Sequence, residues 1–501
     1  MPADDSPAIL VARFLRANNY TETLAAFLAE AGLPQDAGAC SSKALTIEQV
    51  LQEKKAYDLS VNFEKLGSED EATAAARWTV PAPSVPQVLT LPTATNLLCV
   101  SVAPLLLSNE TAQPQPVLLA STADRRLNVL TADAEGFALV HSYLNLQDSP
   151  ILHHIVVGRR YVICTSMSGA VVAFDSVASK VVDRRRDHAK YVVQVAAFER
   201  DDGRVWLATA GWDGKVLLYL AHVAAEGNFS FDAPIAIAPQ PTNPEALYFV
   251  RRPDDNQLHL VVSRRDSSFL YYYEVSEPPL PTTTAEAAAT SAAPTPATLQ
   301  PVGRQNLAPH SNAWVAFTPA AIAPRPDDPT LVAVATTAVP HMKLIIARLL
   351  FPTGPEPARR LNADPADSAA LSRASLLDDA SGANETAVQQ ARAALALQDR
   401  EAAAIAIHCT TMAAQTPYST PTLAWRPDGS GVWVNGDDGV VRGIEAATGK
   451  VVSNLEGHEA GSKIRCLWAG YIAGTVTGVA DAEKKECLLS GGFDQRLIAW
   501  R

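Results

Sequence analysis

Several features that would mark particular classes of protein are missing from this sequence. It contains no run of about 18 apolar residues, the length that a membrane-spanning helix needs. Its N-terminus also lacks the basic stretch followed by an apolar one that is typical of a secretory signal peptide. We therefore expect a soluble protein of the cytoplasm, the nucleus or both, with no membrane partner.

Cysteines and basic residues are both scarce. The chain has 6 cysteines among 501 residues and no Cys-x-x-Cys pair, and several cysteines lie inside apolar stretches. This usage is typical of buried free thiols in a reducing compartment. The 41 basic residues are outnumbered by 53 acidic ones, which gives a net charge of −12. This balance argues against direct nucleic-acid binding through bulk electrostatics.

Motifs of common catalytic sites are absent as well. The sequence has no G-x-x-x-x-G-K-[ST], G-x-S-x-G or H-E-x-x-H element. His153 and His154 are adjacent, but neighbouring side chains on a strand point to opposite faces, so they do not predict a shared metal ion. We expect a protein that is not an enzyme, with no catalytic residues, no cofactor and no metal.

What the sequence does contain is a repeated pattern of two apolar stretches joined by a polar turn. Its clearest copies centre on Asp213, Asp438 and Asp494, and weaker copies centre on Asp124, Ser168 and Asp266. Such patterns predict β-hairpins, because tight turns need residues that tolerate a positive φ. The sixth residue beyond each turn position is bulky and apolar: Leu130, Phe174, Tyr219, Tyr272, Ile444 and Trp500. This regularity predicts a repeat unit that packs one face into a shared core.

The last of these repeats carries a recognisable set of polar residues. The turns recur after about 45 residues, from Asp124 to Gly169 and from there to Gly214, a period that suits four strands per unit. At this point the chain resembles the WD-repeat β-propeller family. The family's polar residues match His458, Ser490, Asp494 and Trp500. The resemblance implies that these four form a buried, structural hydrogen-bonded chain, and not a catalytic triad.

A seventh repeat around residues 331–350 completes the count. The last repeat ends at Arg501 without an outer strand, which would leave unpaired backbone groups on an open edge. Residues 84–91, at the other end of the repeat region, can supply that strand. The expected fold is therefore mainly β, a seven-bladed WD-type propeller over residues 78–501.

The long intervals after Asp266 predict two insertions in the propeller. One lies at about residues 275–302, is rich in proline, threonine and alanine, and is expected to be flexible. The other lies at about residues 351–404, is polar and alanine-rich, and includes an expected helix at 385–403.

A small helical module precedes the repeats. Residues 7–33 predict two helices separated by Asn18-Asn19, each with a stripe of apolar residues. Two such short helices bury little apolar surface alone, so we expect them to self-associate. Farther along, a capping-box pattern at Thr46 predicts a connector helix over residues 44–66.

The same module resembles the lissencephaly-homology (LisH) motif. The matching residues are Phe14-Leu15, Asn19-Tyr20, Phe27 and Glu30. The resemblance implies a homodimer with a four-helix interface, for which we predict contacts from Phe14, Leu15, Tyr20, Leu24 and Phe27. The alternative is an ordinary helical hairpin that packs against the propeller.

The densest basic run, Arg184, Arg185 and Arg186, is flanked by two aspartates. It predicts either a solvated loop between blades or a contact for an acidic partner.

Together these features predict a non-enzymatic, dimeric scaffold that binds protein partners through its propeller. An adaptor subunit of a ubiquitin ligase, or of a chromatin or splicing complex, is the alternative from the same modular set. An enzyme with a propeller-borne site is the alternative from another class.

Overall fold

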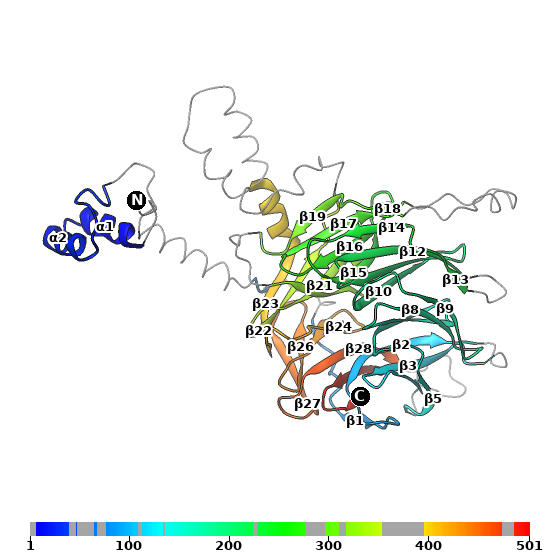
Figure 1. The fold of residues 1–501 in the computed structure, drawn as a ribbon. Helices are drawn as coiled ribbons and strands as arrows, with labels where there is room; N and C mark the ends of the chain where they lie inside the picture. The colour runs from blue at the N-terminus through cyan, green and yellow to red at the C-terminus, as the bar shows by residue number, and fades with distance from the viewer. Residues whose placement is uncertain are drawn as a thin grey trace. The chain divides into compact units, whose positions relative to one another are not determined.

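The structure is a computed structural model, and it divides into two compact units. It describes residues 7–39, 47, 65–67, 77–108, 113–133, 136–223, 229–276, 296–309, 317–352, 395–472 and 485–501. One unit contains the two N-terminal helices and the other contains all the described strands, as Figure 1 shows. In these ranges no helix is both long and apolar enough to cross a membrane.

The N-terminal unit is a helical hairpin of α1 (Pro7–Ala17) and α2 (Thr21–Glu30). The chain reverses at Asn19, whose φ of 58° lies in the left-handed region that asparagine tolerates better than most residues. The hairpin has a small core of its own, made of Ile9, Ala12, Leu24, Leu28 and Ala37. The predicted helix–turn–helix is therefore confirmed.

The second unit is a β-propeller with seven sheets, or blades. Blade one has β2 (Leu97–Leu105), β3 (Gln115–Thr122), β4 (Arg126–Thr131) and β5 (Leu139–Leu144). Blade two has β6 (Ile151–Val157), β7 (Tyr161–Ser166), β8 (Val171–Asp175) and β9 (Lys180–Arg185). Blade three has β10 (Val192–Glu199), β11 (Arg204–Gly211), β12 (Lys215–Val223), β13 (Phe229–Phe231), β14 (Ala236–Pro239) and β18 (Ala297–Thr298).

The remaining four blades have four strands each. Blade four has β15 (Pro244–Arg251), β16 (Leu258–Arg264), β17 (Phe269–Glu274) and β19 (Gly303–Asn306). Blade five has β20 (Pro319–Arg325), β21 (Asp328–Thr336), β22 (His341–Arg348) and β23 (Ile405–Ala414). Blade six has β24 (Leu423–Trp425), β25 (Gly431–Val434), β26 (Val440–Glu445) and β27 (Val451–Glu456). Blade seven has β28 (Ile464–Ile472), β29 (Lys485–Gly492), β30 (Leu497–Trp500) and β1 (Pro86–Leu89).

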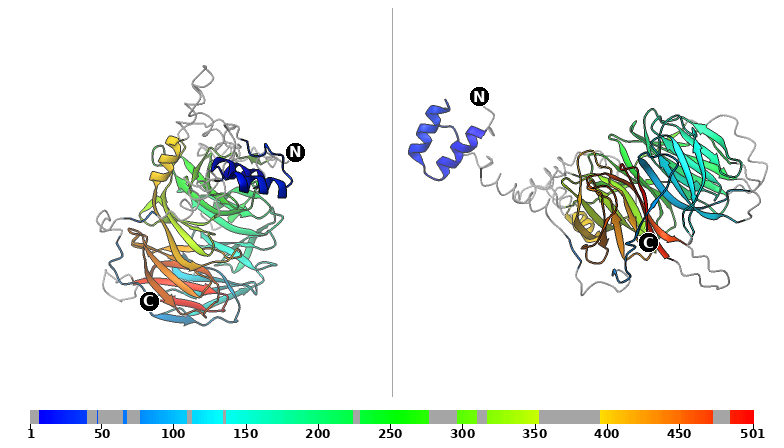
Figure 2. Two further views of the ribbon diagram at one scale, coloured as in Figure 1. Left: turned by 90° about the vertical axis from the view of Figure 1, so that its left-hand side faces the viewer. Right: turned by 90° about the horizontal axis from the view of Figure 1, so that it is seen from below.

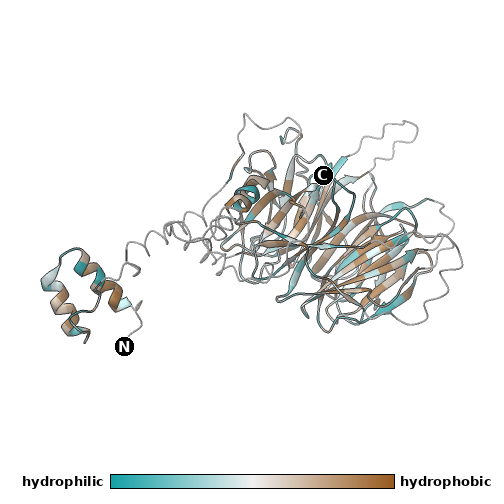
Figure 3. Cartoon of the chain, turned by 90° about the horizontal axis from the view of Figure 1, so that it is seen from above, coloured by the Kyte–Doolittle hydropathy of each residue, from teal (hydrophilic) through white to brown (hydrophobic). Residues whose placement is uncertain are grey.

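Apolar side chains fill the space between every pair of neighbouring blades. Each of seven buried clusters combines residues from two successive blades, and one of them joins blade seven to blade one. The hydropathy colouring of Figure 3 shows the largely hydrophobic strands that supply them. Successive side chains on a strand point to opposite faces, so a largely apolar strand packs against the blades on both of its sides. This packing closes the ring.

The ring closes through strands from opposite ends of the propeller region. β1 pairs antiparallel with β30, and Pro86 lies opposite Trp500. Arg501 continues the pairing, because its backbone N–H donates to Val85 over 3.1 Å. In Figures 1 and 2 the blue start of the propeller accordingly lies beside its red end. The prediction that residues 84–91 complete the last blade is confirmed.

The first predicted insertion needs correction at its C-terminal end, whereas the second ends in a helix as predicted; residues 277–295 and 353–394 lie outside the described residues. The first insertion returns as β18, which pairs in parallel with β14 of blade three, so residues 296–302 are ordered by backbone hydrogen bonds and not flexible. The second ends in a helix over 395–404 that leads directly into β23. There the buried Glu401 carboxylate accepts a hydrogen bond from the Asn306 N–H over 2.7 Å.

Most of the predicted connector helix, residues 44–66, also lies outside the described residues. Its predicted end is wrong, because Lys65 forms a β-bridge with His408 of β23. The Lys65 ammonium donates to the Ala402 carbonyl over 3.1 Å and to that of Ile405, at the end of the helix over 395–404. A cation at a helix C-terminus satisfies carbonyls that have no partner within the helix. The β-bridge to His408 gives the backbone at Lys65 an extended form.

Candidate functional site

The four polar residues predicted for the last repeat lie together in blade seven. The Trp500 indole N–H donates to the Ser490 hydroxyl over 2.9 Å, and Ser490 Oγ lies 2.8 Å from His458 Nε2. His458 Nδ1 lies 2.9 Å from the Asp494 carboxylate. Burial lowers the pKa of His458 despite the opposing effect of Asp494, which favours a neutral imidazole that donates to Asp494. Ser490 is completely buried, so this Ser–His–Asp arrangement holds the turn and offers no accessible nucleophile.

Blade three repeats most of this arrangement. His188 Nδ1 lies 3.0 Å from Asp213, and His188 Nε2 lies 2.8 Å from the Thr209 hydroxyl. Tyr219 replaces tryptophan, and its hydroxyl donates to Asp187 over 3.2 Å. Sequence reasoning missed Thr209, although its position four residues before Asp213 matches that of Ser490 before Asp494.

A segment that precedes blade one crosses blade six and then joins blade seven. We call residues 77–91 the strap. Trp78 packs edge-on against Trp433, with 5.1 Å between ring centroids, and its backbone N–H donates to the Glu445 carboxylate over 2.9 Å. A Cβ atom at Gly431 would lie 2.3 Å from the Trp78 ring, and one at Gly443 would lie 2.5 Å from it. Two glycines of blade six therefore make the space that the indole fills.

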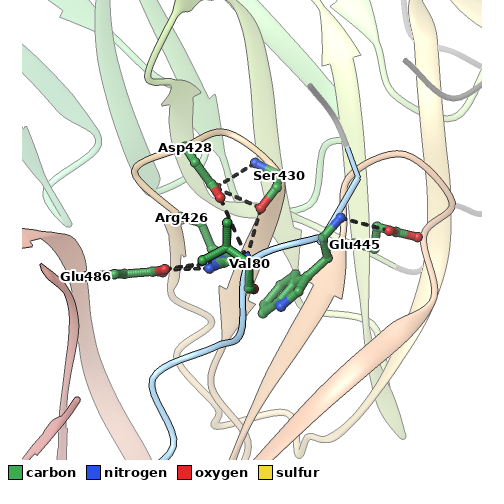
Figure 4. A network of polar contacts seen from close by, with 7 residues as sticks. Val80, Arg426, Asp428, Ser430, Glu445 and Glu486 are labelled. Atoms are coloured by element: carbon green, nitrogen blue, oxygen red, sulfur yellow. Dashed lines mark hydrogen bonds and ion pairs between the residues drawn. The ribbon is translucent and has the colours of Figure 1, made fainter. Parts of the chain in front are cut away.

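The strap is held by an arginine that also links two blades. Arg426 has no exposed surface, and its guanidinium lies 4.2 Å from the centroid of the Trp78 ring. It donates to Glu486 of blade seven over 3.0 Å, to the Val80 carbonyl over 3.3 Å and to Ser430 over 3.0 Å, as Figure 4 shows. One buried cation thus connects blade six, blade seven and the strap.

The residues predicted to form a dimer interface divide into two groups. Tyr20 is 52% exposed and its ring lies 6.4 Å from that of Phe14, which is partly exposed. Leu15 and Phe27 are also partly exposed, although they touch the core of the hairpin. Leu24 is only 8% exposed because α2 turns it toward α1 together with Leu28. Leu24 therefore packs within its own hairpin, and its predicted contact with a second copy stays a prediction.

The basic run does not form the predicted loop. Arg184 and Arg185 belong to β9, the outer strand of blade two, and Arg186 directly follows it. Arg184 donates to the Leu146 carbonyl over 2.8 Å, and Arg185 forms an ion pair of 2.7 Å with Asp187. Two of the three cations therefore have partners within the chain, which weakens the case for a partner contact here.

An aromatic and basic patch is formed by residues that directly flank β10, β11 and β16 in blades three and four. Its members, called the Trp212 patch, are Tyr191, Trp212 and Arg265. The Tyr191 and Trp212 rings lie 5.6 Å apart, and the Arg265 guanidinium lies 4.3 Å from the Trp212 ring. Tyr191 is 40% exposed and the Arg265 side chain 47%, although Arg265 also pairs with Glu245. Sequence reasoning missed this surface.

Burial disfavours the charged forms of Cys99, His153 and His154. The five described cysteines are free and buried, and burial raises the pKa of Cys99 to about 11. Burial likewise lowers the pKa of His153 to about 4 and that of His154 to about 3. In the described part of the chain, no group of three or more histidine, cysteine, aspartate or glutamate side chains is placed to hold a metal ion.

Comparison with known families assigns both units. The family model described as UCP007778, beta-propeller domain, matches residues 70–483, and the model described as UCP007778, LisH domain, matches residues 8–36. No curated protein matches the chain. Because the propeller match alone spans more than half of the sequence, the chain belongs to the UCP007778 family, with an N-terminal LisH domain and a β-propeller domain.

Proposed function

We propose that this protein is a non-enzymatic, dimeric scaffold whose WD-type propeller binds protein partners. The observation that carries the proposal is the Trp212 patch, because tryptophan, tyrosine and arginine are the residues most often found at the energetic centre of protein interfaces. The repeated His–Asp contacts of blades three and seven support the WD-type assignment.

The exposed aromatic surface of the LisH domain supports the dimeric part of the proposal. Phe14 and Tyr20 lie side by side on a hairpin whose own core contains only a few small and aliphatic residues. A unit of this size gains most by covering its remaining apolar surface with a second copy.

For the dimer, we expect the intact chain to have about twice the monomer mass of 53.3 kDa in light scattering after size exclusion. Replacing both Phe14 and Tyr20 with serine should weaken dimerisation by a factor of about ten or more, because buried aromatic contacts at an interface carry about 2 kcal/mol or more. Thr23→Ala, an exposed change on α2, is the control and should leave the mass unchanged. A monomeric intact chain at micromolar concentration would rule out the dimer.

For partner binding, we expect Trp212→Ala and Arg265→Ala to lose a common set of proteins in quantitative affinity purification. Truncation of a central aromatic or arginine at an interface weakens binding by about 30-fold or more. Val452→Ala on β27 is the control, because Val452 is 46% exposed on the outer strand of a different blade. The scaffold proposal fails if all three variants retain the partners of the unmodified protein. Each protein that the unmodified chain retains must also be shown to bind the purified chain directly.

A further inference from the structure

A row of arginine and aromatic side chains extends across blade four. The Arg264 guanidinium lies 4.6 Å from the centroid of the Tyr271 ring, and the centroids of the Tyr271 and Phe269 rings lie 6.3 Å apart. At the other end, the Arg304 guanidinium lies 4.8 Å from the centroid of the Phe269 ring. The register of β17 with β19 supports this order, because Tyr271 lies opposite Arg304. We call these four residues the arginine row.

The arginine row adjoins the Trp212 patch at the turn between β16 and β17. Arg264 is the last residue of β16, and Arg265 of the patch directly follows it. The Arg265 guanidinium lies over the Trp212 ring just as the guanidiniums of the row lie over their own rings. Tyr271 belongs to the buried cluster between blades three and four. The row and the patch therefore form one continuous surface at the junction of these two blades.

The two arginines of the row have no acidic partner in the described part of the chain. Arg264 donates to the Tyr271 hydroxyl over 2.6 Å, whereas the one contact of Arg304 within the described ranges is with the Phe269 ring. A guanidinium that lies over a ring is held in a fixed orientation and keeps N–H donors at its edges for another group. Both side chains are half-buried, so part of each remains open to solvent. The row thus presents two oriented cations whose charge is unmatched.

The charge around this surface is positive, although the whole chain carries −12. Of the neighbouring carboxylates, Glu245 pairs with Arg265, and Asp213 accepts a hydrogen bond from the Ala189 N–H over 3.0 Å. That leaves Asp266, which is exposed in the turn after Arg265. Against it stand four cations that form no ion pair with a described residue: Lys190, Lys215, Arg264 and Arg304.

We propose that the arginine row and the Trp212 patch together bind an acidic segment of a partner protein. Glutamate or aspartate carboxylates of the segment accept hydrogen bonds from Arg264 and Arg304, and an apolar side chain of the segment packs on the exposed ring of Tyr191. The edge of a guanidinium matches a carboxylate with two parallel N–H donors. This inference rests on the proposed function, because it names the chemistry of the partner that the Trp212 patch binds.

Two other kinds of anion fit these contacts less well. A phosphate group carries about two charges at one point and is held best by several donors that converge on it. The two guanidiniums of the row are instead separated by two aromatic rings. Single-stranded nucleic acid needs open ring faces on which its bases stack. Here a guanidinium already lies over each of the rings of Trp212, Phe269 and Tyr271, and Tyr271 is only 6% exposed.

The test measures fluorescence anisotropy of a labelled peptide that is titrated with the full-length protein. The probe is a short peptide in which glutamates surround one leucine, and the matched peptide has glutamines in their place. We expect a dissociation constant on the order of 10–100 µM for the glutamate peptide. The glutamine peptide should bind about tenfold more weakly or worse, because it cannot form charge-assisted hydrogen bonds. Raising the salt from about 0.05 to about 0.3 M should weaken the glutamate peptide about threefold or more.

Single substitutions test the two arginines of the row. Arg304→Gln should weaken binding of the glutamate peptide about fivefold to tenfold and leave the fold intact, since Arg304 forms no hydrogen bond with a described residue. Arg304→Lys keeps the charge but not the planar fork, and should weaken binding about threefold. Arg264→Gln should resemble Arg304→Gln, because the Tyr271 hydroxyl keeps its contact with Ser267 over 2.9 Å.

A double variant provides the largest effect and has a matched control. Arg264→Gln, Arg304→Gln should weaken the glutamate peptide about 30-fold or more. The control, Arg348→Gln, Arg496→Gln, removes the same number of charges from other blades. The Arg348 side chain is 55% exposed on β22, and Arg496 is exposed in the turn between β29 and β30. The control should bind within about twofold of the unmodified protein.

The inference is overturned if the two peptides bind alike, if the glutamate peptide shows no saturation below about 1 mM, or if the double variant binds as its control does. It is also overturned if a phosphoserine peptide or a single-stranded RNA of mixed sequence binds while the glutamate peptide does not. Arg304→Gln alone decides the matter if the double variant does not fold. The proposed function fails by a different result, retention of every partner by Trp212→Ala and Arg265→Ala, so the two failures are distinguishable.

Discussion

Deletion of the strap, residues 77–91, from the full-length chain is expected to destroy the cooperative unfolding of the propeller. The deletion removes β1 and leaves the edge of β30 unpaired. It also empties the space between Gly431 and Gly443 that Trp78 fills, and removes Leu89 from the cluster between blades seven and one. Trp78 is partly buried, so its loss alone costs less than the about 3–5 kcal/mol of a fully buried tryptophan, but together with the lost strand and Leu89 the total approaches the about 5–15 kcal/mol that stabilises a typical domain.

The measurement is scanning calorimetry, with deletion of residues 1–39 as the control. That control removes the LisH domain, which forms a separate compact unit, and should leave the propeller transition in place. Equal midpoints for the two deletions would show that the strap does not close the ring. Trp78→Ala should show a smaller loss in the same direction, which separates the tryptophan contact from the strand.

Replacing Arg426 with methionine is expected to cost about 3–5 kcal/mol of unfolding free energy, because it leaves a largely buried carboxylate without its partner. That carboxylate is Glu486, whose side chain is 11% exposed. Urea unfolding of the full-length chain measures the loss. In the double variant Arg426→Met, Glu486→Met, the loss should be smaller than the sum of the single losses by about 2 kcal/mol, since no charge is left buried alone.

An exposed ion pair provides the matched comparison. Arg348 pairs with Asp328 over 3.0 Å, but its side chain is 55% exposed, so Arg348→Met should cost less than about 1 kcal/mol. Similar losses for Arg426→Met and Arg348→Met would contradict the role assigned to Arg426. Additive losses in the double variant would show that Glu486 is held by other groups.

The hairpins and the closure of the ring could be predicted because their cause is local. Each polar turn residue lies between two strands, and a bulky apolar residue follows six positions later. The repeat is therefore visible in the sequence itself. The missing outer strand was equally visible, since an unpaired edge demands a partner.

Other features depend on contacts between distant residues and left little trace in the sequence. The pairing of β18 with β14 is set by where an insertion returns, which no local pattern encodes. Leu24 lies on an apolar stripe, but a stripe does not tell whether it faces its own hairpin or a second copy. Trp78 stands alone in its segment, and the two glycines that receive it lie more than 350 residues away, at 431 and 443.

The strap also constrains when the propeller can finish folding. β1 precedes blade one, whereas its partner β30 belongs to the last blade, so ribosomal synthesis produces the two strands at widely separated times. Blades one to six can assemble from neighbouring segments, but blade seven must wait for a contact of very high sequence separation, which is slow to form. The LisH domain is complete long before then. In the proposed dimer, two nascent chains on one messenger RNA would thus pair through their N-termini while both rings are still open.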